Sequence, residues 1–173
     1  MTTPTVTIKK SKGFGGSVTV PGDKSISHRA VIFGAIAEGI TKVTGFLPGE
    51  DNLSTIAAFR AMGVDIQEDS PTELTIHGKG LHGLTEPADI IDAGNSGTTT
   101  RLLIGLLAAQ SFSSTITGDD SLKLRPMMRV VKPLRQMGAS IDGKDGGRLL
   151  PLTITGSKLH AIDYKSPVAS AQL

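Results

Sequence analysis

The order of landmarks in the first half of the sequence returns in the second half, and this repeat restricts the fold more than any other feature. Each pair of landmarks shares its residue types and its place in the order, so coincidence is a poor explanation. Self-similarity at one period is typical of proteins built from repeated supersecondary units. The pairs, which recur at a nearly constant separation, are Arg29 with Arg101, Thr44-Gly45 with Thr117-Gly118, and Met62-Gly63 with Met137-Gly138.

Hydrophobic periodicity and turn residues predict the same elements in both units: strand, helix, strand, helix, strand, strand. In the first unit we expect strands and helices at 16–20, 26–37, 41–44, 53–62, 64–66 and 74–76. In the second unit we expect them at 90–91, 99–109, 113–117, 126–137, near 141 and at 152–154. The predicted fold class is therefore α/β, with repeated βαβαββ units.

A third unit is predicted to begin near the end of the sequence. Adding the repeat period to Gly97 leads to Ala169–Gln172, which has the composition of the loop before a third helix. We therefore expect the first repeat at about 16–80, the second at about 86–156, and the start of a third at about 160–173. The expectation is a chain with two complete repeats that is a fragment of a longer protein.

The composition argues against several classes of function. Aromatic residues make up 3% of the 173 residues and Trp is absent, so base stacking on single-stranded nucleic acid has little to use. The net charge of +2 is too small and too evenly spread for DNA binding. No apolar run approaches the roughly 20 residues of a membrane span. The lack of cysteine fits a reducing compartment. We expect a soluble, cytoplasmic protein that binds neither nucleic acid nor membranes.

The segment Val20–Ala30 has the pattern of an anion-binding loop at a helix N-terminus. A Pro-Gly turn leads into the expected helix, whose free backbone N–H groups and dipole attract negative charge. Lys24 and Arg29 add positive charge, and Ser25 adds a hydroxyl donor. A capped helix with solvated basic residues is the alternative interpretation. A P-loop requires Gly directly before Lys-Ser, and Asp23 occupies that place here, so that motif is excluded.

A second loop and a separate arginine extend the predicted site. Within Asn95–Arg101, Gly97 permits close backbone approach and the hydroxyl residues offer donors. Taken alone, such a run is as often a simple turn with a helix cap. Arg125 directly precedes a proline that starts a helix, where a bidentate grip on carboxylate or phosphate is possible. A surface arginine near a helix start is the alternative.

The other charged residues and the histidines give weaker signals. We expect Arg129 and Arg135 to be ordinary surface charges. Asp119 and Asp120 are two adjacent acids without a further ligand pattern, so a solvated loop is favoured over a metal site. None of the four histidines has partners at metal-ligand spacing, and no metal is expected. His28 lies inside the first loop, where we expect it to support the loop and not to catalyse.

Four motifs carry a resemblance to a known family. They are Pro-Gly-Asp-Lys-Ser-Ile-Ser-His-Arg at 21–29, Gly-Asn-Ser-Gly-Thr at 94–98, Leu-Arg-Pro-Met at 124–127, and Ser-Ala-Gln at 170–172. Together and in this order, they resemble the 5-enolpyruvylshikimate-3-phosphate synthase family over the whole length. The resemblance implies transfer of the enolpyruvyl group of phosphoenolpyruvate to the 5-hydroxyl of shikimate 3-phosphate, with release of phosphate. It implies no metal or organic cofactor, and a fold of two domains, each of three such repeats, that closes on the substrates.

The resemblance also implies roles for residues in these motifs. The residues expected to bind shikimate 3-phosphate are Lys24, Ser25, Arg29, Ser170 and Gln172. The residues expected at the phosphoenolpyruvate site are Lys24, Gly97, Arg125 and Gln172. One departure is Ala171, where some members of the family carry a second Ser, so one possible hydrogen bond to phosphate is missing.

The resemblance places half of the active site outside this sequence. Residues 1–20 are expected to pack on the absent second domain, and 21–173 to form part of the N-terminal domain. The absent half supplies the acids and further cations for proton transfer, so we expect no catalytic residue here and a chain that binds without catalysing. The expected partners are the two substrates and the missing C-terminal half, in a protein that is a monomer when complete and belongs to the glyphosate target family.

Two other functions remain open on the sequence alone. The sister family, UDP-N-acetylglucosamine enolpyruvyl transferase, has a similar fold, but it typically carries Lys-Asn where this sequence has Lys24-Ser25. A stand-alone phosphate-binding module without catalysis would also explain the basic, glycine-rich loops.

Overall fold

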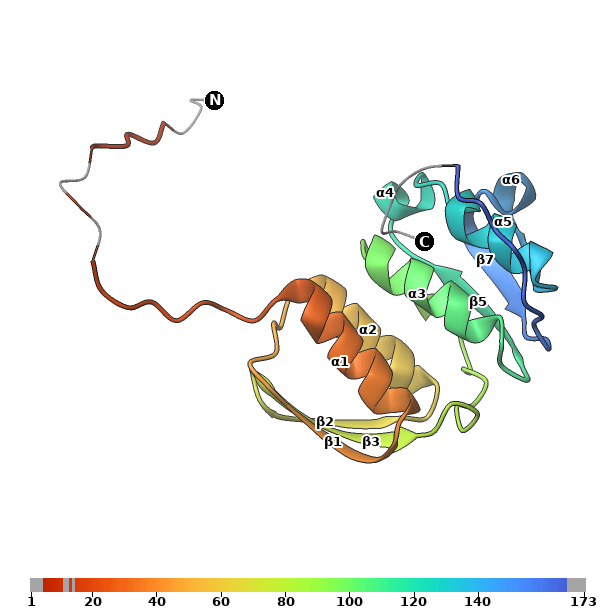
Figure 1. Ribbon diagram of the computed structural model, residues 1–173, viewed down its shortest axis with the longest axis horizontal. Coiled ribbons are helices and arrows are strands. Elements are labelled where there is room, and N and C mark those ends of the chain that lie inside the picture. The colour runs from red at the N-terminus through yellow and green to blue at the C-terminus, as the bar shows by residue number, and fades with distance from the viewer. Residues whose placement is uncertain (1–4, 11–12, 14, 168–173) are drawn as a thin grey trace.

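The computed structural model describes residues 5–10, 13 and 15–167, most of which form two α/β units that pack against each other (Figure 1). The elements of the first unit are α1 (Lys24–Ile36), β1 (Glu38–Thr44), α2 (Glu50–Ala61), β2 (Asp65–Ser70) and β3 (Glu73–Lys79). Its three strands form an antiparallel sheet in the order β1-β3-β2. The last strand in sequence therefore lies in the middle of the sheet.

The second unit has the same plan with one more strand. Its elements are β4 (Ile91–Asp92), α3 (Gly97–Leu107), β5 (Ser113–Thr117), α4 (Asp120–Lys123), α5 (Met128–Gln136), β6 (Ser140–Gly143), α6 (Lys144–Gly147) and β7 (Leu149–Thr155). The sheet order is β4-β5-β7-β6, with β4 parallel to β5 and the other pairs antiparallel. The order β5-β7-β6 matches β1-β3-β2, so the predicted α/β fold of repeated units is confirmed.

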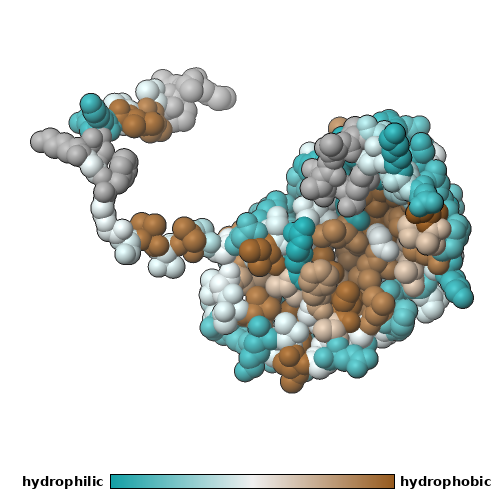
Figure 2. Space-filling model, viewed as in Figure 1, coloured by the Kyte–Doolittle hydropathy of each residue, from teal (hydrophilic) through white to brown (hydrophobic). Residues whose placement is uncertain are grey.

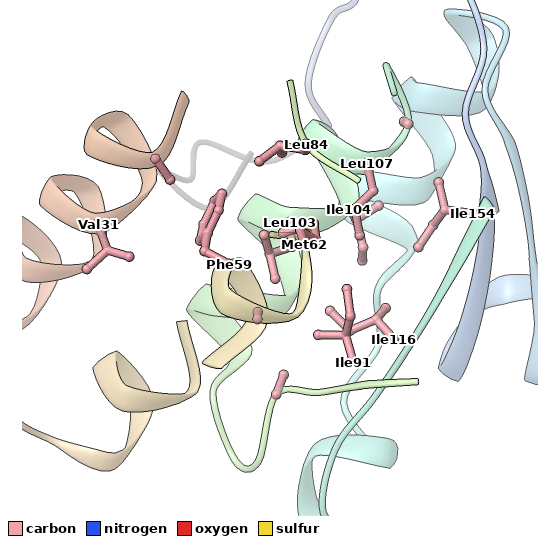
Figure 3. Packing of buried hydrophobic residues seen from close by; sticks show 14 of the residues in the cluster. Val31, Phe59, Met62, Leu84, Ile91, Leu103, Ile104, Leu107, Ile116 and Ile154 are labelled. Carbon is pink, nitrogen blue, oxygen red and sulfur yellow. The ribbon is translucent and has the colours of Figure 1, made fainter. Parts of the chain in front are cut away.

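The two units share one hydrophobic core, which lies between α2, α3 and the second sheet. Figure 3 shows Phe59 and Met62, at the end of the first unit's second helix, close to Leu103 and Leu107 of α3. All four side chains are fully buried, and Ile154 of β7 continues the cluster on the other side of α3. Burial of apolar surface is the dominant favourable term in folding, so this shared core holds the two units in a fixed relation.

Two arginines at equivalent positions make the same hydrogen bond in both units. Arg60 Nε of α2 donates to the carbonyl of Ile66, and Arg135 Nε of α5 donates to the carbonyl of Ile141, both at 3.1 Å. Arg60 and Arg135 are as far apart in the sequence as Ile66 and Ile141, so the two bonds are equivalent in the repeat. Each bond ties the end of a helix to the strand that follows. The expectation that Arg135 is an ordinary surface charge was therefore wrong.

Glycine stops the second helix of each unit, as the sequence predicted. Gly63 and Gly138 adopt φ values of 85° and 98°, a left-handed conformation that costs glycine little and other residues more. In each unit the residue after this glycine donates a hydrogen bond from its N–H to a carbonyl of the helix. Val64 N–H donates to the carbonyl of Phe59, and Ala139 N–H donates to that of Leu134.

The strand expected at 16–20 does not form. The structure assigns no strand to residues 15–20, and the side chains of Val18 and Val20 are 89% and 76% exposed. The chain leads away from the start of α1 instead of returning along the sheet (Figure 1). Among the described residues, β1 consequently pairs with β3 alone, and the first sheet has no strand in the place that β4 takes in the second.

The turn that precedes the helix differs between the two units. In the second unit β4 turns into α3 through Gly94, whose φ is 56°. Gly94 lies two residues before Ser96, the cap of α3. In the first unit the cap of α1 is Asp23, and the residue two positions before it is Pro21. A proline ring fixes φ at a negative value, so the first unit cannot make the turn that returns β4 to its sheet.

The helix caps also correct the repeat register at the first loop. Asp23 and Ser96 are the N-cap residues of α1 and α3, and they occupy equivalent positions in the two units. Counted from these caps, the residue of the first unit that is equivalent to Arg101 is His28, and not Arg29. The pairing of Arg29 with Arg101 made from the sequence was off by one residue, because it matched charge and had no cap geometry to count from.

Hydrophobic side chains remain exposed on one face of the two units. Figure 2 shows them gathered over α1 and α3, on the face that Figure 1 presents to the viewer. Ile26 and Phe33 of α1 are 69% and 63% exposed, and Leu102 of α3 is 41% exposed. The described part of the chain contains no helix with the length and apolar character needed to cross a membrane.

Candidate anion-binding site

The first predicted loop is held in place by hydrogen bonds at the start of α1. Asp23 Oδ1 accepts from the N–H of Ile26 at 2.7 Å. The Ser27 hydroxyl donates to the carbonyl of Asp23 at 2.8 Å and accepts from the N–H of Leu47 at 3.0 Å. The loop that follows β1 is thereby tied to the loop that precedes α1. These bonds place Lys24 in the first turn of α1, so the helix begins before the start expected at residue 26.

The two cations of this loop already have internal partners. Lys24 Nζ forms an ion pair with Asp51 Oδ2 in the first turn of α2, while its side chain remains 53% exposed. Arg29 Nη1 donates to the carbonyl of Ser25 at 3.1 Å. Arg29 is exposed, so its guanidinium has donors free to contact a ligand. An anion that binds here must compete with Asp51 for Lys24.

The second loop positions Arg125 through a short relay of side chains. Arg125 Nη2 donates to Asn95 Oδ1 at 2.5 Å, and Asn95 Nδ2 donates to Asp119 Oδ2 at 2.6 Å. Asp119 also caps α4, because its Oδ1 accepts from the N–H of Leu122 at 2.7 Å. The guanidinium of Arg125 thus lies beside Gly97, where it can be reached by a small anion.

Asp119 is exposed, as expected for a loop carboxylate, but it is not an isolated one. The hydrogen bond from Asn95, followed by the backbone N–H of Leu122, lowers the pKa of Asp119 below its ordinary value. The carboxylate therefore stays ionised at neutral pH and keeps Asn95 oriented toward Arg125.

A cavity of about 630 Å³ brings the two loops together between α1, α3 and α5. Its polar lining includes Ser25 and Arg29 from the first loop and Gly97 from the second. Two further guanidinium groups, those of Arg101 and Arg129, and the phenol of Tyr164 complete that lining. The lining contributed by the described residues contains three arginines and no carboxylate, so the cavity is suited to an anion.

The arginines around this cavity repel one another. Burial is the first cause of a lowered pKa for Arg101, and the charges of Arg125 and Arg129 lower this pKa further. Arg101 Nη1 and Nη2 donate to the carbonyls of Gly97 and Pro126 at 3.3 and 3.4 Å, and its buried Nε has no partner among the described residues. A bound anion would relieve this repulsion. Arg129 is exposed, as expected for a surface charge, and it also lines this cavity.

The structure brings together part of the predicted site. Ser25, Arg29 and Gly97 line one cavity. A methyl group placed on Gly97 would lie 3.4 Å from Arg125 Nη1, so Arg125 is adjacent to the same space. Lys24 is directed to Asp51 and is not part of the cavity wall. Ser170 and Gln172 lie outside the described residues.

Several residues of the site were not predicted from the sequence. Asp51 is one of a pair of acids at a helix start, and the sequence offers no sign that it reaches Lys24. Asn95 and Asp119 are far apart along the chain, so their contact depends on tertiary structure. Arg101 was named in the sequence as the end of the second loop, but no part in the cavity lining was predicted for it.

We expect Gly97→Ala to weaken the binding of a small anion such as inorganic phosphate about tenfold and to change the free energy of unfolding by less than about 1 kcal/mol. A methyl group at Gly97 would lie 2.7 Å from Arg101 Nη1, so the flexible ends of the arginines must move while the backbone need not. Calorimetric titration and urea unfolding measure the two quantities.

Gly105→Ala is the matched control for this prediction. Gly105 lies on the same helix and lines the same cavity, but a methyl group there would meet no atom within 4 Å. Equal losses of affinity in the two variants would show that cavity volume, and not displacement of the arginines, controls binding.

Comparison with known proteins shows the family of the chain. The family model described as EPSP synthase (3-phosphoshikimate 1-carboxyvinyltransferase) matches residues 8–173. A 3-phosphoshikimate 1-carboxyvinyltransferase from Citrifermentans bemidjiense is 60% identical over 167 residues, which is 96% of this chain and 39% of the relative. The enzyme of that name from Bacillus cytotoxicus is 58% identical over 166 residues, with the same two shares. A solved EPSP synthase from Acinetobacter baumannii has a TM-score of 0.87 and 57% identity, covering 91% of this chain and 36% of that one.

The fold and the cavity together define an α/β protein of repeated units with a cationic site for small anions. The sequence and structure matches, which extend over almost the whole chain, define it further: the chain belongs to the EPSP synthase family. It spans about two-fifths of the length of the relatives that it matches. The names of these relatives do not favour the amino-sugar transferase considered above.

Proposed function

We propose that this chain provides the acceptor-binding part of an enzyme that transfers the enolpyruvyl group of phosphoenolpyruvate to the 5-hydroxyl of shikimate 3-phosphate. The observation that supports it best is the shared cavity, in which Ser25 and Arg29 face Gly97 among three arginines. Both substrates are phosphate esters that also carry a carboxylate, and such groups are bound well by guanidinium groups and helix N-termini. Relatives that are about 60% identical carry the name of this activity.

Within this proposal each loop has its own ligand. Ser25 and Arg29 bind shikimate 3-phosphate, since they lie together at the start of α1. Gly97 and Arg125 bind phosphoenolpyruvate, since the glycine leaves space directly beside the guanidinium. Lys24 leaves Asp51 to contact both substrates. The proposal also assigns the shikimate phosphate to Ser170 and a place between the substrates to Gln172.

The described cavity can bind and polarise these substrates, but it lacks groups for the proton transfers. The reaction requires loss of the proton from the attacking hydroxyl and transfer of a proton to the methylene carbon of phosphoenolpyruvate, before phosphate departs. The cavity lining contains no carboxylate among the described residues, and Asp23 and Asp119 of the loops already accept hydrogen bonds from the N–H of Ile26 and from Asn95. We therefore expect binding without turnover until the rest of the protein supplies an acid and a base.

The proposal extends to the arrangement of the complete protein. Residues 1–20 pack on the second domain, and 21–173 belong to the first, with repeats at about 16–80 and 86–156 and a third beginning at about 160. The exposure of Val18, Val20 and the hydrophobic face of α1 supports this, because these groups are left without a cover in the described part of the chain. The complete enzyme is proposed to be a cytoplasmic monomer that needs no metal or organic cofactor, as the resemblance implies.

Calorimetric titration of the chain with shikimate 3-phosphate tests this function. The proposal predicts binding that is at least about tenfold tighter than the binding of shikimate or inorganic phosphate, because the phosphate and the ring must be held together. A folded chain with no preference for the phosphorylated acceptor contradicts it. Tighter binding of UDP-N-acetylglucosamine would assign the site to the other enolpyruvyl transferase family.

A further inference from the structure

A buried chain of side-chain hydrogen bonds joins the helices that carry the two anion-binding loops. His28 Nδ1 of α1 lies 2.7 Å from Thr55 Oγ1 of α2. Thr55 Oγ1 lies 2.7 Å from Thr99 Oγ1 of α3, and Thr99 Oγ1 lies 2.7 Å from Ser96 Oγ. All four residues are fully buried. The two bonds between helices, His28–Thr55 and Thr55–Thr99, are buried and hold α1, α2 and α3 relative to one another, and the third bond ties Thr99 to the cap of α3.

Both ends of this hydrogen-bond chain touch the candidate site. Ser96 caps α3 and accepts from the N–H of Thr99, so it sets the place where Gly97 begins the helix. Thr99 Oγ1 also lies 3.2 Å from the carbonyl oxygen of Asp51, the residue whose carboxylate holds Lys24. His28 lies in the first loop's helix, one turn beyond Lys24. A change at His28 can therefore reach Gly97 through hydroxyl groups alone.

We propose that His28 is a positioning residue, which orients the second loop through Thr55, Thr99 and Ser96 and so sets the affinity of the Gly97–Arg125 site without touching the ligand. This inference rests on the proposed function only in naming the ligand of that site. His28 lies outside the cavity, and the proposal gives it a role in ligand binding at the second loop.

The proton positions follow from the donors and acceptors available. With the imidazole donating from Nδ1 to Thr55, the Thr55 hydroxyl can donate to Thr99 or to the carbonyl of Asp51 at 3.3 Å, Thr99 can donate to that carbonyl, and Ser96 donates to Thr99. Every hydroxyl proton is then used. His28 Nε2 has no hydrogen-bond partner among the described residues, and a buried acceptor without a partner is more common in proteins than a buried N–H without one. The imidazole is therefore neutral, with its proton on Nδ1.

The charged groups that face His28 also keep it neutral. Burial is the main cause of a lowered pKa for His28, and Lys24 and Arg29 lower the pKa further, while Asp51 acts in the opposite direction. Protonation would place an N–H without a partner in the core and a third positive charge near two cations. The folded state thus loses stability as pH falls below the ordinary histidine pKa of about 6.5, where the unfolded chain gains its proton first.

Nuclear magnetic resonance of the ligand-free, 15N-labelled chain tests the proposal. We expect the ring of His28 to carry its proton on Nδ1 at pH 7.5. As the His28 ring gains its proton on acidification, we expect the amide signals of Ser96 and Gly97 to shift with the same midpoint as the ring. In His28→Asn, whose side-chain amide can still donate to Thr55, these shifts should vanish while the loop signals keep their pH 7.5 positions.

A second pair of variants separates positioning from titration. Thr55→Val interrupts the hydrogen-bond chain and leaves His28 in place, so the response of Gly97 to pH should be lost. The matched control is Thr75→Val, which removes an exposed hydroxyl bonded to Asp69 and should leave the response intact. The proposal is overturned if Gly97 responds to pH in His28→Asn as in the wild type, or if the His28 ring carries its proton on Nε2.

Ligand binding provides an independent readout. Thr55→Val should weaken phosphoenolpyruvate binding about tenfold and change shikimate 3-phosphate binding less than twofold, because only the second loop is displaced. Equal losses for both ligands would contradict the proposal. If the wild-type chain binds neither ligand, the proposed function fails, and the ligand-free resonance measurements still decide whether His28 positions the loop.

Discussion

Arg29→Ala lowers the affinity of the chain for shikimate 3-phosphate by about 100-fold, the largest effect that we expect from any change in the cavity. A guanidinium group forms two parallel bonds with a phosphate, and each hydrogen bond to a charged group contributes about 1.5–3 kcal/mol. Arg29 lines the cavity, and its hydrogen bond to the carbonyl of Ser25 is one that a ligand need not break. Calorimetric titration measures the loss directly.

The control for Arg29→Ala is Arg148→Ala. Arg148 is half-exposed and forms its ion pair with Asp145, close by in the sequence and outside the cavity. This variant loses the same charge from the chain but should bind shikimate 3-phosphate as the wild type does. Losses smaller than about threefold in Arg29→Ala, or equal losses in the two variants, would mean that the acceptor binds elsewhere.

Phe59→Ala reduces the free energy of unfolding by about 3–5 kcal/mol. Phe59 has no exposed surface and lies where α2 meets α3, so its removal leaves a cavity that both units must border (Figure 3). Urea unfolding followed by circular dichroism gives the change in midpoint and slope. Because the core is shared, both units should unfold in one transition.

Phe33→Ala provides the matched comparison, since it removes the same side chain from an exposed site. Phe33 is 63% exposed on α1. We expect a loss below about 1 kcal/mol, as is usual for surface substitutions. Two separate transitions in the wild-type chain, or equal losses for the two phenylalanines, would contradict the single shared core.

Much of the fold was predictable because local signals and tertiary packing agree. The second strand of the second unit was predicted at 113–117, where β5 lies. Gly63 and Gly138 stop helices since few other residues accept their backbone conformation, and this requirement is visible in sequence. The repeat was visible in pairs such as Met62-Gly63 and Met137-Gly138, while the equivalent hydrogen bonds of Arg60 and Arg135 emerged only from the structure.

The errors in the fold arise where one residue changes the geometry. Residues 16–20 have the alternation of a strand, but Pro21 stands where the second unit has the glycine of the turn between β4 and α3.

Helix α4 (Asp120–Lys123) was missed because so short a helix carries too little periodicity to be recognised. Helix α6 (Lys144–Gly147) was missed for the same reason, and its Asp145 has a positive φ that no sequence pattern announced.

The candidate site was predictable as a set of loops and not as a set of contacts. The two loops were expected to face one pocket because they hold equivalent places in the two repeats, and Ser25, Arg29 and Gly97 do line one cavity. The ion pair between Lys24 and Asp51 was not, because it joins side chains of two helices whose packing the sequence does not state. The hydroxyl chain from His28 was hidden for the same reason, since threonine is common both in cores and on surfaces.

A chimeric enzyme tests the central claim that this chain supplies one half of an enolpyruvyl transferase active site. Residues 8–173 replace the matching segment of the Citrifermentans bemidjiense relative, which is 60% identical there. Phosphate release is measured with phosphoenolpyruvate and shikimate 3-phosphate present together and separately. The remainder of the relative without this segment, and the chain alone, are the controls.

The account predicts that the chimera releases phosphate only when both substrates are present, at a rate within about tenfold of the intact relative. Arg125→Ala in the chimera should reduce that rate, which would show that the loops of this chain are in use. A folded chimera that releases no phosphate, or one whose activity is unaffected by Arg125→Ala, would contradict the account.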